Sequence, residues 1–551
     1  MRFQNLCFLF FLFTYCFSFG QNYKITYQKI SNGKTNTQNP ILVLGNSKLS
    51  VITNEDIVAE KADFPFEITI FNAEEKLLFN TTTLSKNKTI NTCDTTSIAK
   101  YKFDNTNDYK EILGYRCKKA TTVINSNTIE VWFTNALNMK ASPSIIGIDL
   151  GVVLEINRNN TFTIRAAKIE KTKQEFPKIP NIKNCIDKLT YNDLVWKSKF
   201  NTIPIFENEV INFSEKSTSN DSILRFANGT VIVKKIQFPK LSSSDLTFID
   251  VTEQSNGDAY DRTGSVFIIP QDKTDSFLNG MQNGTKTLPI YTNGNGKEYQ
   301  GVVATESYNP PIELLRFFTP FGIAHYNYIE LKGKDWFNKA FYRQDISELN
   351  SYLSEKELYI GCFIGNYDKG GHKVSINLTL HKEENIVKEN TTILPLFNTT
   401  NVLEMAGQNY GSMFDNENGL QVIFTLEKPI KNAKLRYITT GHGGWENGDE
   451  FVPKENSIYL DGKLAYNFTP WRQDCGSFRL YNPASGNFSN GLSSSDYSRA
   501  NWCPGMATNP VYIALGNLEA GTHTLQVKIP QGQPEGNSFS YWNVSGVLIG
   551  N

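Results

Sequence analysis

Two short clusters of charged residues have the composition needed for acid–base chemistry. The first, residues 258–262, reads Asp-Ala-Tyr-Asp-Arg and precedes an apolar run at residues 266–269, which predicts a β-strand. The second contains Glu446, Asp449 and Glu450. A carboxylate beside a cation can activate a water molecule and stabilise charge that develops during its attack. The same residue types form ordinary turns and solvated loops, so the pattern alone leaves both interpretations open.

The histidines and cysteines argue against a metal centre. No His-x-His or His-His pair occurs, whereas a copper site needs several imidazoles. No cysteine lies in a CxxC motif or a Cys/His cluster, which is the usual pattern of a zinc site. We therefore expect neither a metal nor another cofactor. The five histidines are His325, His372, His381, His442 and His523.

The elements that position these clusters are predicted to be β-strands. Short alternating or apolar runs recur along the chain, separated by Gly/Asn/Asp/Ser clusters. A helical period is hard to find, and residues 345–353 are the best candidate. We predict an all-β protein with two packed antiparallel sheets per domain. The clearest runs are residues 66–70, 152–156, 266–269, 374–378, 422–424 and 525–529.

The N-terminal 20 residues predict export. Arg2 is followed by an apolar run that ends near Gly20, which is typical of a signal peptide cleaved after that residue. Cys16 lacks the preceding small residues of a lipoprotein signal, and no other stretch is long and apolar enough to span a bilayer. We expect a secreted or periplasmic protein. Its net charge without Arg2 is −1 and no basic run occurs, so nucleic acid is a poor partner.

Export makes disulfides possible. Cleavage would leave an even number of cysteines, although the sequence alone does not give their connectivity. The remaining residues are Cys93, Cys117, Cys185, Cys362, Cys475 and Cys503.

From about residue 217 to the C-terminus, the chain resembles the bacterial peptide-N-glycosidase F family. The most specific match is Asn-Trp-Cys-Pro-Gly-Met-Ala at residues 501–507, where the family has a near-identical Trp-Cys-Pro-Gly-Met-Ala. Residues 258–262 resemble the family's Asp-Glu-Trp-Asp-Arg, and residues 316–321 are similar to its Arg-Phe-x-Thr-Pro-Tyr. Residues 440–451 resemble its Gly/His loop and Ala-Glu-Trp element.

This resemblance implies two side-by-side antiparallel jelly rolls with the active site in the cleft between them. We expect the rolls at residues 217–386 and 387–551, after a polar linker at residues 208–216. Residues 21–207 look like the extra β-rich N-terminal domain of the larger family members.

The resemblance also implies the activity and the site. It points to an amidase that cleaves N-linked glycans from asparagine in glycoproteins and glycopeptides, acting as a monomer. Asp261 matches the catalytic carboxylate that orients or deprotonates the water. Glu450 matches the second essential carboxylate, which holds the first N-acetylglucosamine and the water network. The substrate-binding residues implied in the same cleft are Asp258, Arg262, Arg499 and Trp502.

Three features depart from or match the family pattern. A third family acid has no counterpart in residues 361–366, and Tyr367 is the nearest candidate for its aromatic neighbour. Gly257 and Gly448 occupy family cysteine positions, so other contacts must hold both loops. One family disulfide is matched by Cys475 with Cys503.

We further expect Cys93 to pair with Cys117, and the remaining two cysteines to stay unpaired because they lie in different domains.

Two other functions remain open. A copper monooxygenase can have paired jelly rolls, and activity in the presence of a chelator would exclude it. A non-catalytic glycan-binding protein could keep the fold and lose the acids, as the missing third carboxylate allows. Release of ammonia and glycan from a glycopeptide would exclude that function.

Overall fold

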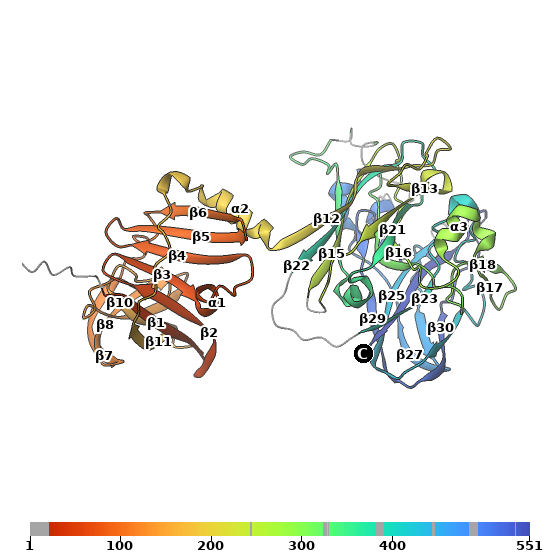
Figure 1. Cartoon of the computed structure of the whole chain (residues 1–551). Coiled ribbons are helices and arrows are strands. Elements are labelled where there is room, and N and C mark those ends of the chain that lie inside the picture. The colour runs from red at the N-terminus through yellow and green to blue at the C-terminus, as the bar shows by residue number, and fades with distance from the viewer. Residues whose placement is uncertain are drawn as a thin grey trace, which may run out of the picture. The chain divides into compact units, whose positions relative to one another are not determined.

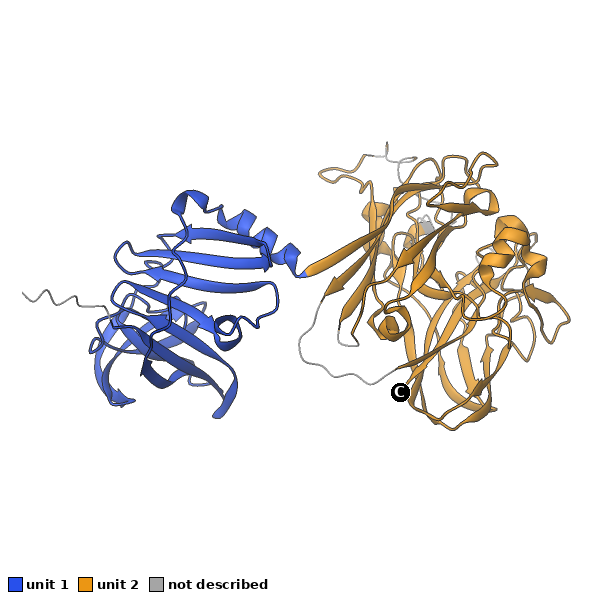
Figure 2. Cartoon of the chain, viewed as in Figure 1, with its two compact units in different colours: residues 1–199 blue, residues 200–551 orange. Residues whose placement is uncertain are grey.

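The structure of the protein is a computed structural model. It describes residues 21–551 apart from 243–244, 323–324, 326–327, 329, 382–390, 444–446, 484–493 and 535, so the predicted signal peptide lies outside the described residues. The chain forms two compact units, residues 1–199 and 200–551 (Figure 2). Strands dominate both units (Figure 1), which confirms the all-β prediction. No helix in the described ranges is long and apolar enough to cross a membrane.

The N-terminal unit is built on one antiparallel sheet of eleven strands, in the order β6-β5-β4-β3-β2-β1-β11-β10-β9-β8-β7. Its helix α2 (Lys188–Ser198) is capped at the N-terminus by Asp187, whose carboxylate accepts a hydrogen bond from Thr190 N at 3.0 Å. Only Tyr191 of α2 is buried, which explains why no helical period is visible in the sequence. The other elements are β1 (Tyr23–Ser31), β2 (Lys34–Gly45), β3 (Leu49–Asn54), α1 (Glu55–Val58), β4 (Phe66–Asn72), β5 (Leu77–Ser85), β6 (Lys88–Asp94), β7 (Asp104–Ile112), β8 (Tyr115–Ile124), β9 (Asn127–Thr134), β10 (Val152–Arg158), β11 (Phe162–Lys171) and η1 (Ile182–Asn184).

The predicted Cys93–Cys117 disulfide is wrong. Both cysteines are free, and their strands β6 and β8 lie near opposite ends of the eleven-stranded sheet. Cys185 lies beside Cys93 instead, because the Ile186 N–H donates to Asn91 O at 2.9 Å and places the two thiols in contact. Burial and then this contact raise the pKa of the Cys185 thiol.

The first β-sandwich of the second unit has two antiparallel sheets that enclose a large apolar core. β16 (Thr263–Ile269) lies inside its six-stranded sheet and is buried from Gly264 onward, as the apolar run predicts. One sheet is β12 (Phe200–Ile211), β22 (His372–His381), β15 (Leu246–Ser255) and β20 (Ala340–Asp345). The other is β13 (Leu224–Phe226), β14 (Val231–Gln237), β21 (Glu357–Ile364), β16, β19 (Ile312–Phe318) and β28 (Ala507–Thr508).

The start of the second unit differs from the expected domain boundary. β12 pairs with β22 along its length, so residues 208–211 belong to a strand and do not begin a linker. The unit therefore starts at Phe200. The expected boundary between residues 386 and 387 lies outside the described residues.

The second β-sandwich has two antiparallel sheets of four strands each. The alternating sequence of β24 (Leu420–Leu426) places every second side chain in the core. One sheet is β23 (Thr392–Asn398), β31 (Tyr541–Gly550), β25 (Ile430–His442) and β29 (Val511–Leu518). The other is β24, β30 (Gly521–Lys528), β26 (Asn456–Leu460) and β27 (Lys463–Phe468).

Short helices and one hairpin complete the second unit. The helical candidate at residues 345–353 is found as two single turns, η4 (Ser347–Leu349) and α4 (Asn350–Leu353). The remaining elements are η2 (Ala227–Gly229), α3 (Phe277–Asn283), η3 (Thr285–Thr287), β17 (Ile290–Thr292), β18 (Glu298–Gln300), η5 (Glu404–Ala406), η6 (Cys475–Tyr481) and η7 (Ser494–Asp496).

The two sandwiches are joined by backbone pairing and by a buried ion pair. β28 comes from the second half of the unit but pairs with β19 in the first sandwich. On β19, the side chains of Arg316 and Glu313 are fully buried, and Arg316 Nη2 lies 2.7 Å from Glu313 Oε2. Arg316 also donates to Asn543 O at 2.6 Å and to Thr440 Oγ1 at 3.0 Å in the second sandwich. A buried charge is tolerated only with such partners, so this contact fixes the two sandwiches to each other.

Candidate active site

The loop between β15 and β16 carries the first acidic cluster. Asp258 is buried, with 2% of its side chain exposed, and accepts from Arg262 Nε at 2.6 Å and from Arg262 Nη2 at 3.1 Å. The Ser255 hydroxyl donates to Asp258 O at 2.7 Å and closes the turn. The buried carboxylate of Asp258 therefore fixes the position of the Arg262 guanidinium.

A buried histidine completes this support. His372 Nδ1 lies 2.8 Å from Glu253 Oε1, and its Nε2 lies 3.4 Å from Asp258 Oδ2. Burial alone would lower the pKa of His372, but the two carboxylates raise it to about 9. Burial would raise the pKa of Asp258, yet His372 and Arg262 hold it well below its usual range. Both groups are consequently charged at neutral pH.

Gly257 shows why this loop needs no cysteine. Its φ of 151° lies in a region that favours glycine, and a Cβ there would lie 2.8 Å from Asp368 Oδ1. Backbone contacts fasten the loop, with Asn256 N donating to Gly371 O at 2.8 Å. The structure thus supplies contacts that a small-loop disulfide would otherwise provide.

The second acidic cluster lies between β25 and β26. Asp449 is buried and accepts from Trp542 Nε1 at 2.7 Å and from Gly532 N at 3.0 Å. The next residue, Glu450, accepts at its backbone oxygen from Ala500 N at 2.9 Å. Asp449 therefore anchors the loop, and Glu450 is left to face the cavity.

Arg499 connects the two clusters. Its guanidinium forms an ion pair with Glu450 and another with Asp261 Oδ2, the latter at 3.2 Å. Only 2% of the Arg499 side chain is exposed, and its guanidinium carbon lies 4.2 Å from the ring centre of Trp502. Trp502 is in turn fixed by donating from Nε1 to Gly441 O at 3.0 Å.

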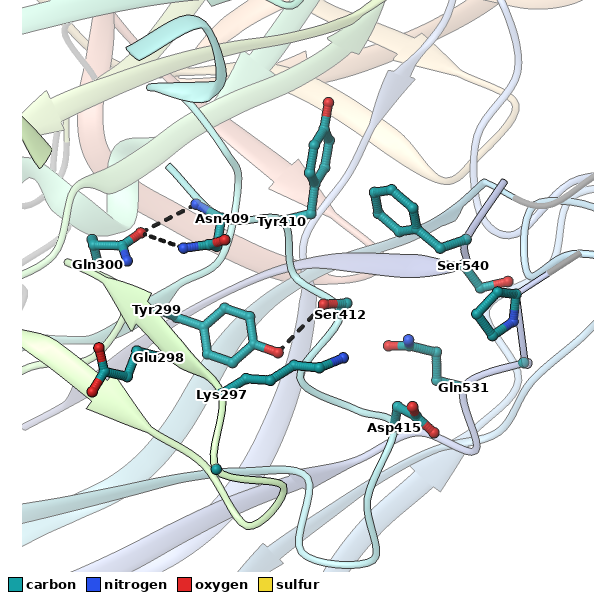
Figure 3. Close-up of a pocket in the computed structure, with 14 residues that line it drawn as sticks. Lys297, Glu298, Tyr299, Gln300, Asn409, Tyr410, Ser412, Asp415, Gln531 and Ser540 are labelled. Atoms are coloured by element: carbon teal, nitrogen blue, oxygen red, sulfur yellow. Dashed lines mark hydrogen bonds between the residues drawn. The ribbon is translucent and has the colours of Figure 1, made fainter. Parts of the chain in front are cut away.

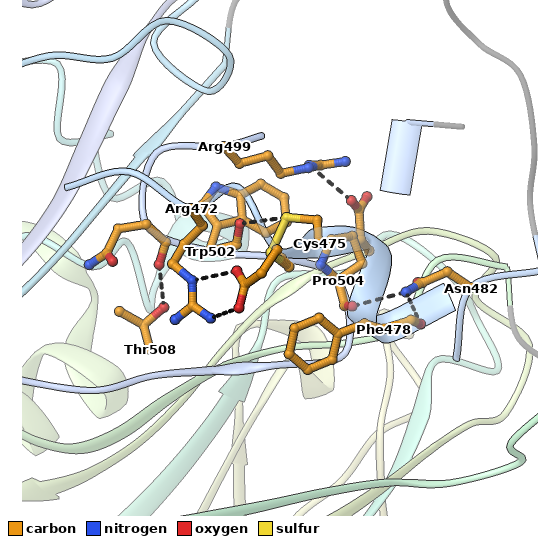
Figure 4. The surroundings of a disulfide bond; sticks show 12 residues. Arg472, Cys475, Phe478, Asn482, Arg499, Trp502, Pro504 and Thr508 are labelled. Atoms are coloured by element: carbon orange, nitrogen blue, oxygen red, sulfur yellow. Dashed lines mark hydrogen bonds and ion pairs between the residues drawn. A yellow bond between two sulfur atoms is a disulfide. The ribbon is translucent and has the colours of Figure 1, made fainter. Parts of the chain in front are cut away.

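The predicted Cys475–Cys503 disulfide is confirmed and lies next to these residues (Figure 4). It ties η6 to the chain that carries Arg499 and Trp502, and Arg472 pairs through its backbone with Arg499. The disulfide therefore supports the segment that bridges the two carboxylates.

The surroundings of Glu450 change its ionisation. Burial raises the pKa of Glu450 to about 7, with the charge of Arg499 opposing the shift and that of Asp261 adding to it. The Glu450 side chain keeps 19% of its surface exposed and that of Asp261 keeps 16%. A carboxyl group whose pKa lies near 7 suits proton transfer near neutral pH.

Residues from both acidic clusters line a cavity of about 250 Å³. Asp261, Arg262, Glu450 and Trp502 reach it, so the structure brings together most of the residues predicted from sequence. Arg499 lies behind the two carboxylates, and Asp258 lies behind Arg262; neither lines the cavity. Asp258 and Arg499 are both predicted to bind substrate, and each contacts a lining residue rather than the cavity itself; their roles stay predictions. The remaining lining residues are Thr263, Phe363, Gly365, Tyr367, Asn401, Glu404, Tyr410, His442, Gly443, Tyr541 and Asn543.

Glu404 is the residue that the sequence analysis missed. It accepts hydrogen bonds from the hydroxyls of Tyr367 and Tyr410 and lies 3.3 Å from Asn401 Nδ2. A Cβ at Gly365 would lie 3.5 Å from its Oε2, so Glu404 fills the space at the end of β21 where residues 361–366 lack an acid. A third carboxylate is present, supplied by η5 in the second half of the unit.

The cavity also contains a buried histidine that is neutral at neutral pH. His442 Nε2 is 2.8 Å from Thr440 Oγ1, and burial followed by the charges of Arg316 and Arg499 lowers its pKa well below the usual range. Within the described part of the chain, no group of three or more His, Cys, Asp or Glu side chains is placed to hold a metal ion.

Comparison with known proteins gives the family. Residues 202–380 match "Peptide-N-glycosidase F, N terminal", residues 409–549 match "Peptide-N-glycosidase F, C terminal", and residues 25–193 match "N-glycanase peptide, N-terminal domain". No curated protein matches the chain.

Two solved structures of PNGF-II resemble the whole chain. The one in space group P21 is 57% identical, covers 96% of this chain and 99% of its own, and has a TM-score of 0.88. The one in space group C2 is 56% identical, covers 96% and 98%, and has a TM-score of 0.79. The chain therefore belongs to the peptide-N-glycosidase F family, in the branch that carries the additional N-terminal domain, and it is an N-glycanase by its domains.

Proposed function

We propose that this chain is an exported amidase that hydrolyses the bond between asparagine and the first N-acetylglucosamine of N-linked glycans. The observation that carries the proposal is the pair Asp261 and Glu450, which share Arg499 at the wall of one cavity. The family membership supports the substrate class.

In the proposed reaction, Asp261 accepts a proton from the attacking water. The water oxygen bonds to the amide carbon of the asparagine side chain, and the bond from that carbon to nitrogen breaks. The nitrogen leaves as the glycosylamine, taking the proton that Asp261 accepted, and the peptide keeps an aspartate. A second water then hydrolyses the free glycosylamine to ammonia and the reducing glycan. Arg499 and Arg262 provide positive charge beside the oxyanion that forms on the way.

Glu450 is assigned to the sugar and the proton balance. With a pKa raised to about 7, it is partly protonated at neutral pH and can both donate a hydrogen bond to the substrate and accept one. Glu404 with its two tyrosines offers a second polar contact for sugar hydroxyls in the same cavity.

The test is release of ammonia and free glycan from a denatured glycopeptide. The expected result is conversion of the glycosylated asparagine into aspartate, detected by mass spectrometry, in the presence of a chelator. Binding of the glycopeptide without release would instead establish a non-catalytic glycan-binding protein. A chemically deglycosylated peptide is the control, since it lacks the reacting bond.

A further inference from the structure

A second, larger cavity borders the active site. Its volume is about 650 Å³, and it shares Tyr410 with the 250 Å³ cavity that holds Asp261 and Glu450 (Figure 3). Small-molecule sites in proteins usually measure about 300–1,000 Å³. The active-site cavity alone is therefore small for a branched glycan, which must continue outside it.

Aromatic rings form the wall between the two cavities. The Tyr410 hydroxyl donates to Glu404 inside the active site, while its ring lies 5.1 Å from that of Phe539 and 5.0 Å from that of Tyr541. Phe539 lines the larger cavity and keeps 39% of its surface exposed. Aromatic surface combined with nearby polar groups suits a sugar ring, which has apolar C–H faces and a polar edge.

The polar lining of the larger cavity mixes donors and acceptors. Lys297 and Gln531 point toward the same space in Figure 3, and the carboxylates of Glu298 and Asp415 lie around it. One cation against two carboxylates gives the lining a net negative charge, which disfavours phosphate and other anions. Within the described residues, the Lys297 ammonium has no ion-pair partner, so it is available to a ligand hydroxyl.

We propose that the larger cavity is a second sugar subsite, which binds the outer sugars of the N-glycan whose first residue lies in the active site. This inference rests on the proposed function. A neutral, hydroxyl-rich ligand matches the lining, and the shared Tyr410 makes the two cavities neighbours.

The experiment compares two substrates that have the same peptide, one carrying only the two core N-acetylglucosamines and the other the complete branched glycan. The variants are Lys297→Ala and the double variant with Gln531→Ala, and the matched control is Lys286→Ala, an exposed lysine of η3 outside both cavities. Loss of one or two hydrogen bonds should raise KM for the branched substrate roughly threefold to tenfold. The kcat on both substrates and the KM for the short one should stay unchanged.

The outcomes distinguish failure of the proposed amidase function from failure of the proposed sugar subsite. If the wild-type protein cleaves neither substrate, the proposed function fails, and calorimetric binding of the free branched glycan to the wild type and the variants still tests the subsite. If both substrates are affected equally, or neither is, the subsite is refuted while the amidase assignment stands. A KM effect that follows peptide length at constant glycan would also refute it, and would mark a peptide site.

Discussion

Replacing Asp261 by Asn isolates the charge of the proposed base. The substitution keeps the size of the side chain but removes its negative charge and its capacity to accept a proton. Asp261 Oδ2 lies 3.2 Å from Arg499, and Arg499 retains Glu450 as a partner, so the loop should stay folded. Loss of a general base typically costs about 100- to 10,000-fold in rate, which is about 3–5 kcal/mol of barrier.

The neighbouring acid provides the control. Asp258→Asn leaves Arg262 and His372 without their buried carboxylate, and breaking a buried ion pair typically destabilises a protein by about 3–5 kcal/mol. We therefore expect this variant to lose thermal stability, while Asp261→Asn melts close to the wild type and loses turnover.

Initial rates on one glycopeptide and thermal melts of both variants make the comparison. The assignment of the base would be refuted if Asp261→Asn turned over at a near-normal rate while Asp258→Asn, still folded at the assay temperature, was inactive. Loss of both activity and folding in Asp261→Asn would instead mean that its charge is needed for structure.

The remaining expectations concern ionisation, covalent support and domain boundaries. Glu450→Gln removes a group with a pKa of about 7, so the rate of the variant should vary less with pH around neutrality than that of the wild type, as initial rates will show. His372 has its pKa raised from 6.5 to about 9, so the stability it contributes is complete below pH 6.5 and is lost as pH rises through 9; His372→Gln should flatten the fall in melting temperature over that range. Replacing Cys475 and Cys503 by serine should cost roughly 3 kcal/mol in denaturant unfolding, and equal stability with and without reductant in the wild type would contradict this. A fragment of residues 200–551 should be soluble on expression, whereas one that begins at residue 217 should aggregate because it lacks β12 and exposes the edge of β22.

Much of the architecture could be predicted from local sequence patterns. The apolar run at residues 266–269 predicts a β-strand, and it forms β16, which is buried inside its sheet. The domain boundary could not be predicted because Asn208 and Glu209 are polar residues close to the polar stretch 214–221, although they belong to the end of an edge strand. Edge strands keep polar side chains that face water, so composition does not separate them from loops.

Some residues of the candidate site could likewise be predicted from local sequence, and others could not. Asp261 and Glu450 could be predicted because each belongs to a short motif. Glu404 could not, since it is a single acid in the short helical turn η5 and only the fold brings it to the end of β21. The burial of Asp258 depends on His372, which is 114 residues away in the sequence, and no local pattern contains that information.

Because β28 comes from the second half of the unit and extends a sheet of the first sandwich, the described residues join the two sides of the opening between the sandwiches by backbone pairing. Widening it would require the backbone pairs of Arg316 and Phe317 to break, together with the buried ion pair beside them. These contacts oppose a change in the width of the opening. A glycan that extends away from the polypeptide surface can enter this opening, whereas a glycan that packs against a folded domain must first dissociate from that domain. Selectivity among glycoproteins would then be determined by the shape and mobility of the substrate around its glycosylated asparagine.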